Sequence, residues 1–193
     1  MWVRRAAIRP VPPFAELSAR TLTEVEDQLS EDDDAARSRL DEAFTRFEET
    51  QPVLANRISA ALSRPVDETA LALGYFLTLA VWLAFDAAFH GEIENVTETA
   101  LTGVEESLQL DEQLRLADPA EALDSDDVIA MEQPHVMAFI HEHIDAALEA
   151  NANEVDVDDV HSIYRLVLIE VLALSYAVKA PPMWTAPSAE FTA

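Results

Sequence analysis

Apolar residues recur every three or four positions along most of the chain, which is the spacing of one buried face of an α-helix. Leu101, Val104 and Leu108, with polar and acidic residues between them, are typical. The pattern predicts helices at about 14–29, 33–62 with an interruption at Gln51-Pro52, 67–90, 95–117, 125–148 with an interruption at Gln133-Pro134, and 156–179. We therefore expect an all-α helical bundle of six or seven helices.

Two stretches of the chain repeat one design. Gln51-Pro52 opens a short helix that is followed by a loop and a long apolar helix, and Gln133-Pro134 opens a second such unit. Tyr75 and Tyr164 stand at the same place in the two long helices, nine residues after the valine of a Val-Asp pair. We interpret the units as two helical-hairpin repeats about a pseudo-twofold axis, each covering the apolar face of the other. Chance similarity of two amphipathic helical pairs is the alternative.

The same patterns predict one domain over residues 14–179, with the repeats at about 33–91 and 125–179. Residues 1–13 contain three arginines and three prolines, so we expect an extended basic arm. The arm either crosses the body of its own or a neighbouring subunit, or is free. Residues 180–193 contain three further prolines and are expected to form an irregular tail.

The composition agrees with an all-α fold and excludes several kinds of chemistry. The 193 residues include only three glycines, too few for the turns of a β-sandwich or for a glycine-rich phosphate loop. There is no cysteine, which excludes disulfides, thiolate metal sites and a cysteine nucleophile. Half of the residues are apolar, so the chain can bury a substantial core.

The chain is strongly acidic, with 37 Asp and Glu against 12 Lys and Arg and a formal net charge of -25. Direct nucleic-acid binding is not expected, because its affinity comes from lysine and arginine. The acidity fits a halophilic surface that works in concentrated salt, and the even spread of carboxylates favours this interpretation. It also fits recognition of a basic partner, including mimicry of a nucleic acid.

The run from Thr69 to Phe85 contains no charged residue and approaches the length of a membrane span. Its flanks are acidic and lack the excess of Lys and Arg that is typical of the cytoplasmic loops of membrane proteins. We therefore expect a buried core helix and no membrane association. No apolar segment follows the basic start of the chain, and we expect a cytoplasmic protein. The two central helices are also expected to bury further surface against a second protomer, in a homodimer with these interface anchors: Trp82, Phe85, Phe89, Leu172 and Tyr176.

Histidines and carboxylates are the only candidates for metal chemistry in this cysteine-free chain. Glu132 with His135, and Asp158 with His161, have the three-residue spacing of carboxylate–histidine metal ligands on a helix. The first pair flanks a proline and the second lies in a helix start, where Asp is typically a cap. The other histidines are His90, His141 and His143. We predict no metal and no cofactor.

Glu170 is unusual because it interrupts the apolar run Leu166–Leu172. If that helix is buried, its carboxyl group must be paired, protonated or facing a cavity. Tyr75 and Tyr164 are expected as further buried polar groups, and Tyr75 or an arginine as a partner of Glu170. A catalytic acid or base is the functional alternative.

No nucleophile elbow, phosphate-binding loop or zinc-protease motif is present. The sequence therefore does not identify a function. It favours a non-catalytic acidic interaction or regulatory protein with an unknown protein partner. The alternatives are a metal- or carboxylate-dependent helical-bundle enzyme and a nucleic-acid mimic that binds a basic partner.

Overall fold

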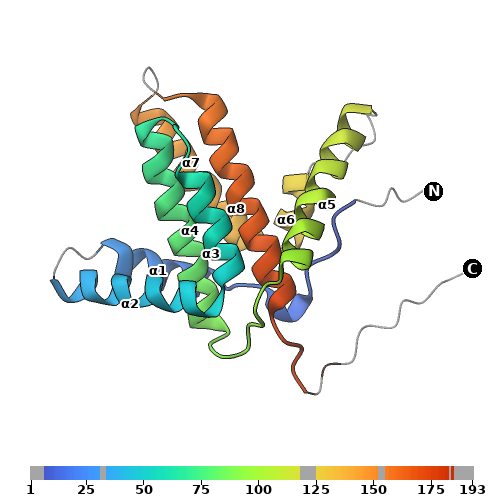
Figure 1. The fold of residues 1–193 in the computed structure, drawn as a ribbon, viewed down its shortest axis with the longest axis horizontal. Coiled ribbons are helices and arrows are strands. Elements are labelled where there is room, and N and C mark those ends of the chain that lie inside the picture. Colours follow the sequence, from blue (N-terminus) through green and yellow to red (C-terminus); the bar gives the residue numbers. More distant parts are fainter. Residues whose placement is uncertain (1–6, 31–33, 118–124, 152–154, 183, 185–193) are drawn as a thin grey trace, which may run out of the picture.

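The computed structural model describes residues 7–30, 34–117, 125–151, 155–182 and 184, and the described chain is all-α (Figure 1). Its helices are a short 3-10 helix at Pro13–Ala15, α1 (Ala19–Ser30), α2 (Asp34–Thr50), α3 (Pro52–Leu62), α4 (Glu68–Ala88), α5 (Glu98–Ala117), α6 (Ser125–Glu132), α7 (Pro134–Ala150) and α8 (Val157–Ala177). These eight α-helices exceed the expected six or seven, because each Gln-Pro step ends one helix and begins another.

The two long apolar helices, α4 and α8, lie side by side at the centre. Asp67 caps α4 by accepting hydrogen bonds from Thr69 N and Ala70 N at 2.9 and 3.1 Å, and Asp156 caps α8 by accepting from Asp158 N at 2.9 Å. Asp67 N also donates to Asp159 Oδ2 at 2.7 Å, so the two helices start together and run in the same direction.

Both central helices are long and apolar enough to cross a membrane, with mean hydropathy of 1.7 for α4 and 1.4 for α8. In the fold, 61% and 67% of these apolar stretches are buried inside the protein. Helix α1 packs against α4, and α5 packs against α8. The hydrophobic character of the pair is therefore accounted for by the core that they form with their neighbours.

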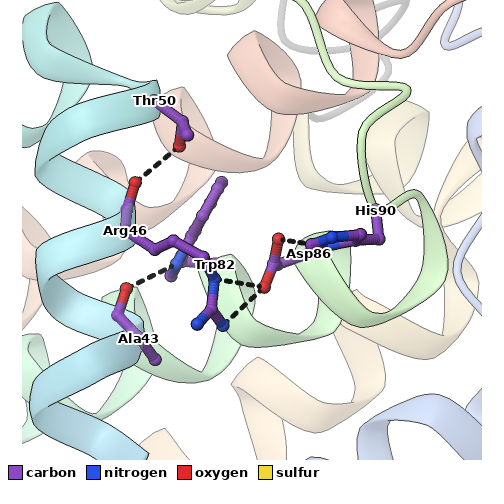
Figure 2. Close-up of polar contacts among 6 residues, drawn as sticks. All are labelled: Ala43, Arg46, Thr50, Trp82, Asp86 and His90. Carbon is purple, nitrogen blue, oxygen red and sulfur yellow. Dashed lines mark hydrogen bonds and ion pairs between the residues drawn. The ribbon is translucent and has the colours of Figure 1, made fainter.

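Helix α2 is attached to α4 through a small polar group (Figure 2). The buried indole of Trp82 donates to the backbone carbonyl of Ala43 at 3.2 Å. Arg46 donates to one carboxylate oxygen of Asp86 at 2.8 Å, and the other oxygen lies 3.3 Å from His90 Nδ1. These contacts join helices from residues about 40 positions apart.

Gln51 connects the first half of the fold to the second. It is fully buried at the start of α3, with Pro52 in the first helical position. Its side chain donates from Nε2 to Glu94 O at 3.0 Å and accepts from Val96 N at Oε1 at 2.8 Å. The glutamine thus satisfies two backbone groups of the extended segment that leads into α5.

Gln133 makes the reciprocal connection at the start of α7. Its Nε2 donates to Ala15 O at 2.7 Å, and its Oε1 accepts from Leu17 N at 3.0 Å. Nε2 also donates to the hydroxyl of Ser175 at 3.0 Å. As with Gln51, the side chain binds one carbonyl and the amide two residues later, here in the segment that leads into α1.

The first helix begins five residues later than the apolar pattern predicts, at Ala19 rather than Phe14. Leu17 contributes its backbone amide to Gln133 and its side chain to the core, so the segment before α1 stays extended. Ser18 then caps the helix by accepting from Thr21 N at 3.1 Å.

Helix α5 starts in the same way as α1. Thr97 is the cap and accepts from Ala100 N at 3.2 Å, whereas the side chain of Asn95 donates to Thr50 O at 3.1 Å. Glu98 is the first residue of the helix.

The described part of the N-terminal arm lies on the body of its own chain. Ile8 and Val11 are buried in the core, and Ala7 N donates to Asp111 Oδ1 at 3.4 Å. Residues 1–6 lie outside the described residues, as does most of the tail after residue 182. Ile93 and Val178 form an isolated antiparallel bridge where α8 ends.

Candidate functional site

A cavity of about 400 Å³ opens where the start of α5 meets the end of α8. One wall is the extended segment that Gln51 holds in place, and the opposite wall is the last two turns of α8. The lining residues are Arg9, Glu94, Asn95, Val96, Thr97, Thr99, Ala100, Gly103, Val104, Ser107, Ala173, Tyr176 and Ala177. Its size is within the range of small-ligand pockets.

Arg9 and Tyr176 form the polar edge of this cavity. The Arg9 guanidinium carbon lies 4.1 Å from the centre of the Tyr176 ring, a cation–π contact. The Tyr176 hydroxyl donates to the backbone carbonyl of Arg9. Burial raises the pKa of Tyr176 to about 12, and the nearby Arg9 charge acts in the opposite direction. The phenol therefore remains protonated at neutral pH, and it fixes the arm beside the cavity.

Helices α5 and α8 are antiparallel along the cavity. Glu94 N, just before α5, donates to Ala177 O at the end of α8 at 2.8 Å. Further along α5, Glu112 forms an ion pair with Arg165, three turns earlier in α8. The middle of α5, around Ser107, is thus level with the middle of α8, around Glu170.

Glu170 lies on the same stripe of α8 as Ala173 and Ala177, three and seven residues further on, which line the cavity. It is fully buried, and neither carboxyl oxygen has a hydrogen-bond partner in the described structure. Burial raises the pKa of Glu170 well above its ordinary value of 4.5. Burial therefore favours the neutral form of Glu170, which lies one helical turn inward from the cavity wall.

The two tyrosines expected as buried polar groups are not in the interior with Glu170. Tyr75 is 53% exposed, so that expectation is wrong. Tyr164 is half-buried, and its hydroxyl lies 2.8 Å from His141 Nε2. Neither tyrosine is bonded to Glu170.

Three of the residues expected as dimer anchors serve the core of the chain itself. Trp82, Phe85 and Leu172 are almost completely buried within the single chain, so the expectation that they form an interface is wrong. Their side chains fill the space around the central helix pair, which the apolar pattern alone does not distinguish from a dimer contact. Phe89 is half-buried, and the half-buried Tyr176 contacts the arm.

The carboxylate–histidine pairs do not assemble into a metal centre. Among the described residues, no group of three or more His, Asp or Glu side chains is placed to hold a metal ion. His135 and His161 are exposed. His143 instead packs against Phe139 and lies 3.5 Å from Glu26.

The sequence interpretation missed the residues that shape the site. Gln51 and Gln133 are recognisable as repeated helix-breaking steps, but not as buried side chains that hold distant backbone. The signal available in the sequence was the Gln-Pro step itself, which occurs once before each short helix. Arg9 and Gly103 belong to no motif or spacing that would mark them as cavity residues in the sequence.

Comparison with known proteins gave no match to a family model, to a curated protein or to a solved structure.

Proposed function

We propose that this protein is a cytoplasmic, non-catalytic interaction or regulatory protein that docks a partner on the C-terminal half of α5. An apolar strip there supports the proposal: Leu110 and Leu114 lie one turn apart and are 50% and 37% exposed. Leu116, in the last turn, is 82% exposed. In Figure 1, α5 stands at the edge of the molecule and diverges from α8 toward its C-terminal end. Covering such a strip with a partner is favourable.

The charge of α5 indicates the chemistry of the partner. The helix contains five acidic residues and a single basic one, Arg115. An amphipathic partner helix with leucine-like residues on one face and basic residues at its edges would complement both features. The carboxylates would increase the rate of encounter, and the leucines would supply most of the affinity.

The experiment compares two double variants of the tagged chain, expressed in its native host. Leu110→Ser with Leu114→Ser changes the strip, and Tyr75→Ser with Val157→Ser changes two other exposed apolar residues. We expect at least one protein to co-purify with the wild type and with the control variant, but not with the strip variant. Calorimetry with that purified protein should then show the same order of affinity.

An identical set of captured proteins for both double variants would contradict the proposal, as would capture no greater than that of an untagged chain. A captured DNA-binding protein whose basic surface is blocked would favour nucleic-acid mimicry instead. A second copy of the chain, detected by light scattering and lost in the strip variant, would favour a homodimer.

We also infer that the fold arose by internal duplication, with α1–α4 and α5–α8 as the repeats. The segments 15–18 and 94–97 support this, because each is bound by a glutamine of the other half and each ends in the cap of the next helix. The capped starts of α4 and α8 add a third correspondence. The exchange of segments between the halves resembles a fused, intertwined dimer.

A further inference from the structure

We propose that the cavity between α5 and α8 binds a small organic carboxylate, with the carboxylate beside Arg9 and an apolar body between the two helices. This site is separate from the proposed docking strip, because neither Leu110 nor Leu114 lines the cavity.

Arg9 provides the charge for recognition of an anion. Within the described part of this very acidic chain, Arg9 makes no ion pair, although carboxylates outnumber basic residues threefold. Its guanidinium is exposed at the cavity edge and is oriented by the ring of Tyr176. A planar carboxylate can accept two parallel hydrogen bonds from a guanidinium.

Gly103 keeps the cavity open. It lies inside α5, where glycine is less favourable than alanine. A Cβ atom added there would meet nothing within 4 Å, so close packing does not require glycine at this position. Its missing side chain instead leaves room in the cavity wall, opposite Ala173 of α8.

The inner wall suits an apolar body. Val104, Ala173 and Ala177 present small apolar side chains, and the hydroxyls of Thr99 and Ser107 lie among the polar lining. Glu170 lies one turn earlier in α8 and is fully buried. Burial raises its pKa and so favours the neutral form, which does not repel an anion. Glu94 is the acidic residue of the lining, near the mouth, and it favours a ligand with a single negative charge.

The probes are benzoate and hexanoate, titrated into the full chain at constant ionic strength and followed by NMR chemical shifts. We expect saturable shifts at residues of the cavity with at least one probe. The neutral amides benzamide and hexanamide should bind about tenfold more weakly, since they lack the charge that pairs with Arg9. The same loss is expected for Arg9→Gln with the carboxylates.

Arg64→Gln is the matched control, because Arg64 is also an exposed arginine without an ion pair in the described chain, but lies at the end of α3. It should bind like the wild type. Gly103→Leu fills the cavity without a clash at Cβ, and should abolish binding while the thermal midpoint is unchanged or raised.

No saturable shift with either probe would overturn the proposal. Equal loss of binding in Arg9→Gln and Arg64→Gln would do so too, because it would show a general charge effect. Inorganic phosphate competing as well as the carboxylates would also overturn it, because the cavity would then recognise charge alone and not an apolar body. Unchanged binding in Gly103→Leu would place the ligand elsewhere.

Discussion

Gln51 and Gln133 have the same backbone conformation, with φ −130° and ψ 52° at the first and φ −136° and ψ 57° at the second. Each precedes a proline, which disfavours helical geometry at the glutamine and is suited to the first position of a new helix. An amide side chain carries both a donor and an acceptor, so one glutamine can satisfy a carbonyl and an amide of an extended segment. The two halves of the fold are thereby joined by reciprocal contacts.

Gln133→Leu and Gln51→Leu are each expected to lower the free energy of unfolding by about 2–4 kcal/mol. Each substitution leaves one carbonyl and one amide without a partner; both are buried at Gln133, whereas at Gln51 the amide is buried and the carbonyl is part-buried. Gln133→Leu should cost more, because it also removes the bond to Ser175. Urea denaturation at fixed salt measures the effect.

Gln28→Leu, on the exposed face of α1, is the control for these variants and should change stability by less than about 0.5 kcal/mol. If the two buried glutamines tolerate leucine equally well, their hydrogen bonds do not stabilise the fold.

Glu170→Gln is expected to remove a pH dependence of stability. The folded protein holds a proton on Glu170 at pH values where the unfolded chain, with its ordinary pKa of 4.5, releases it. Stability therefore falls as pH rises above 4.5, by about 1.4 kcal/mol per pH unit, until the raised folded pKa is passed. The variant should match the wild type below pH 4.5 and be increasingly more stable above it.

Urea denaturation across a pH series tests this, with the exposed Glu106→Gln as the reference. Parallel stability curves for wild type and Glu170→Gln would show that the Glu170 pKa is not raised on folding.

The same substitution at two glycines should have opposite effects. In Gly74→Ala, the added Cβ would lie 2.7 Å from Leu62 Cδ2 and 2.9 Å from Ile163 Cδ1, both of which are buried. We expect a loss of about 1 kcal/mol. Gly103→Ala meets no such contact and should gain about 0.5–1 kcal/mol from helix propensity. Thermal unfolding of both variants measures the difference, and a gain in both would contradict the close packing at Gly74.

Stability should rise with salt concentration, because a net charge of -25 repels itself and salt screens that repulsion. We expect the thermal midpoint in about 1 M KCl to exceed that in about 0.05 M KCl. Because the Debye length shortens as salt is added, most of the increase in the midpoint should occur before this length has fallen to a few ångströms. Circular dichroism measures it, and sucrose controls for general stabilisation by cosolutes. An equal midpoint at both concentrations would remove support for the salt-adapted interpretation.

The sequence determined the all-α fold and most helix boundaries because these depend on neighbouring residues. Apolar spacing marks the helical faces, Asp67 and Asp156 mark the starts of the long helices, and prolines mark the breaks. Gly91, with φ 76°, marks the chain reversal after α4. None of these features needs a contact from a distant part of the chain.

Only the tertiary structure decided which of these residues face one another. Tyr75 and Tyr164 each stand nine residues after the valine of a Val-Asp pair, yet their surroundings differ. Tyr164 contacts His141 of α7, eight residues after Gln133. Tyr75 is exposed, and the residue eight positions after Gln51 in α3 is Ser59. The sequence allows Trp82 to contact either a second subunit or α2 of its own chain. In the structure α2 packs over Trp82, and the indole donates to Ala43 O of that helix. Such contacts depend on the relative rotation of helices that lie far apart in the chain, which periodicity along one helix does not specify.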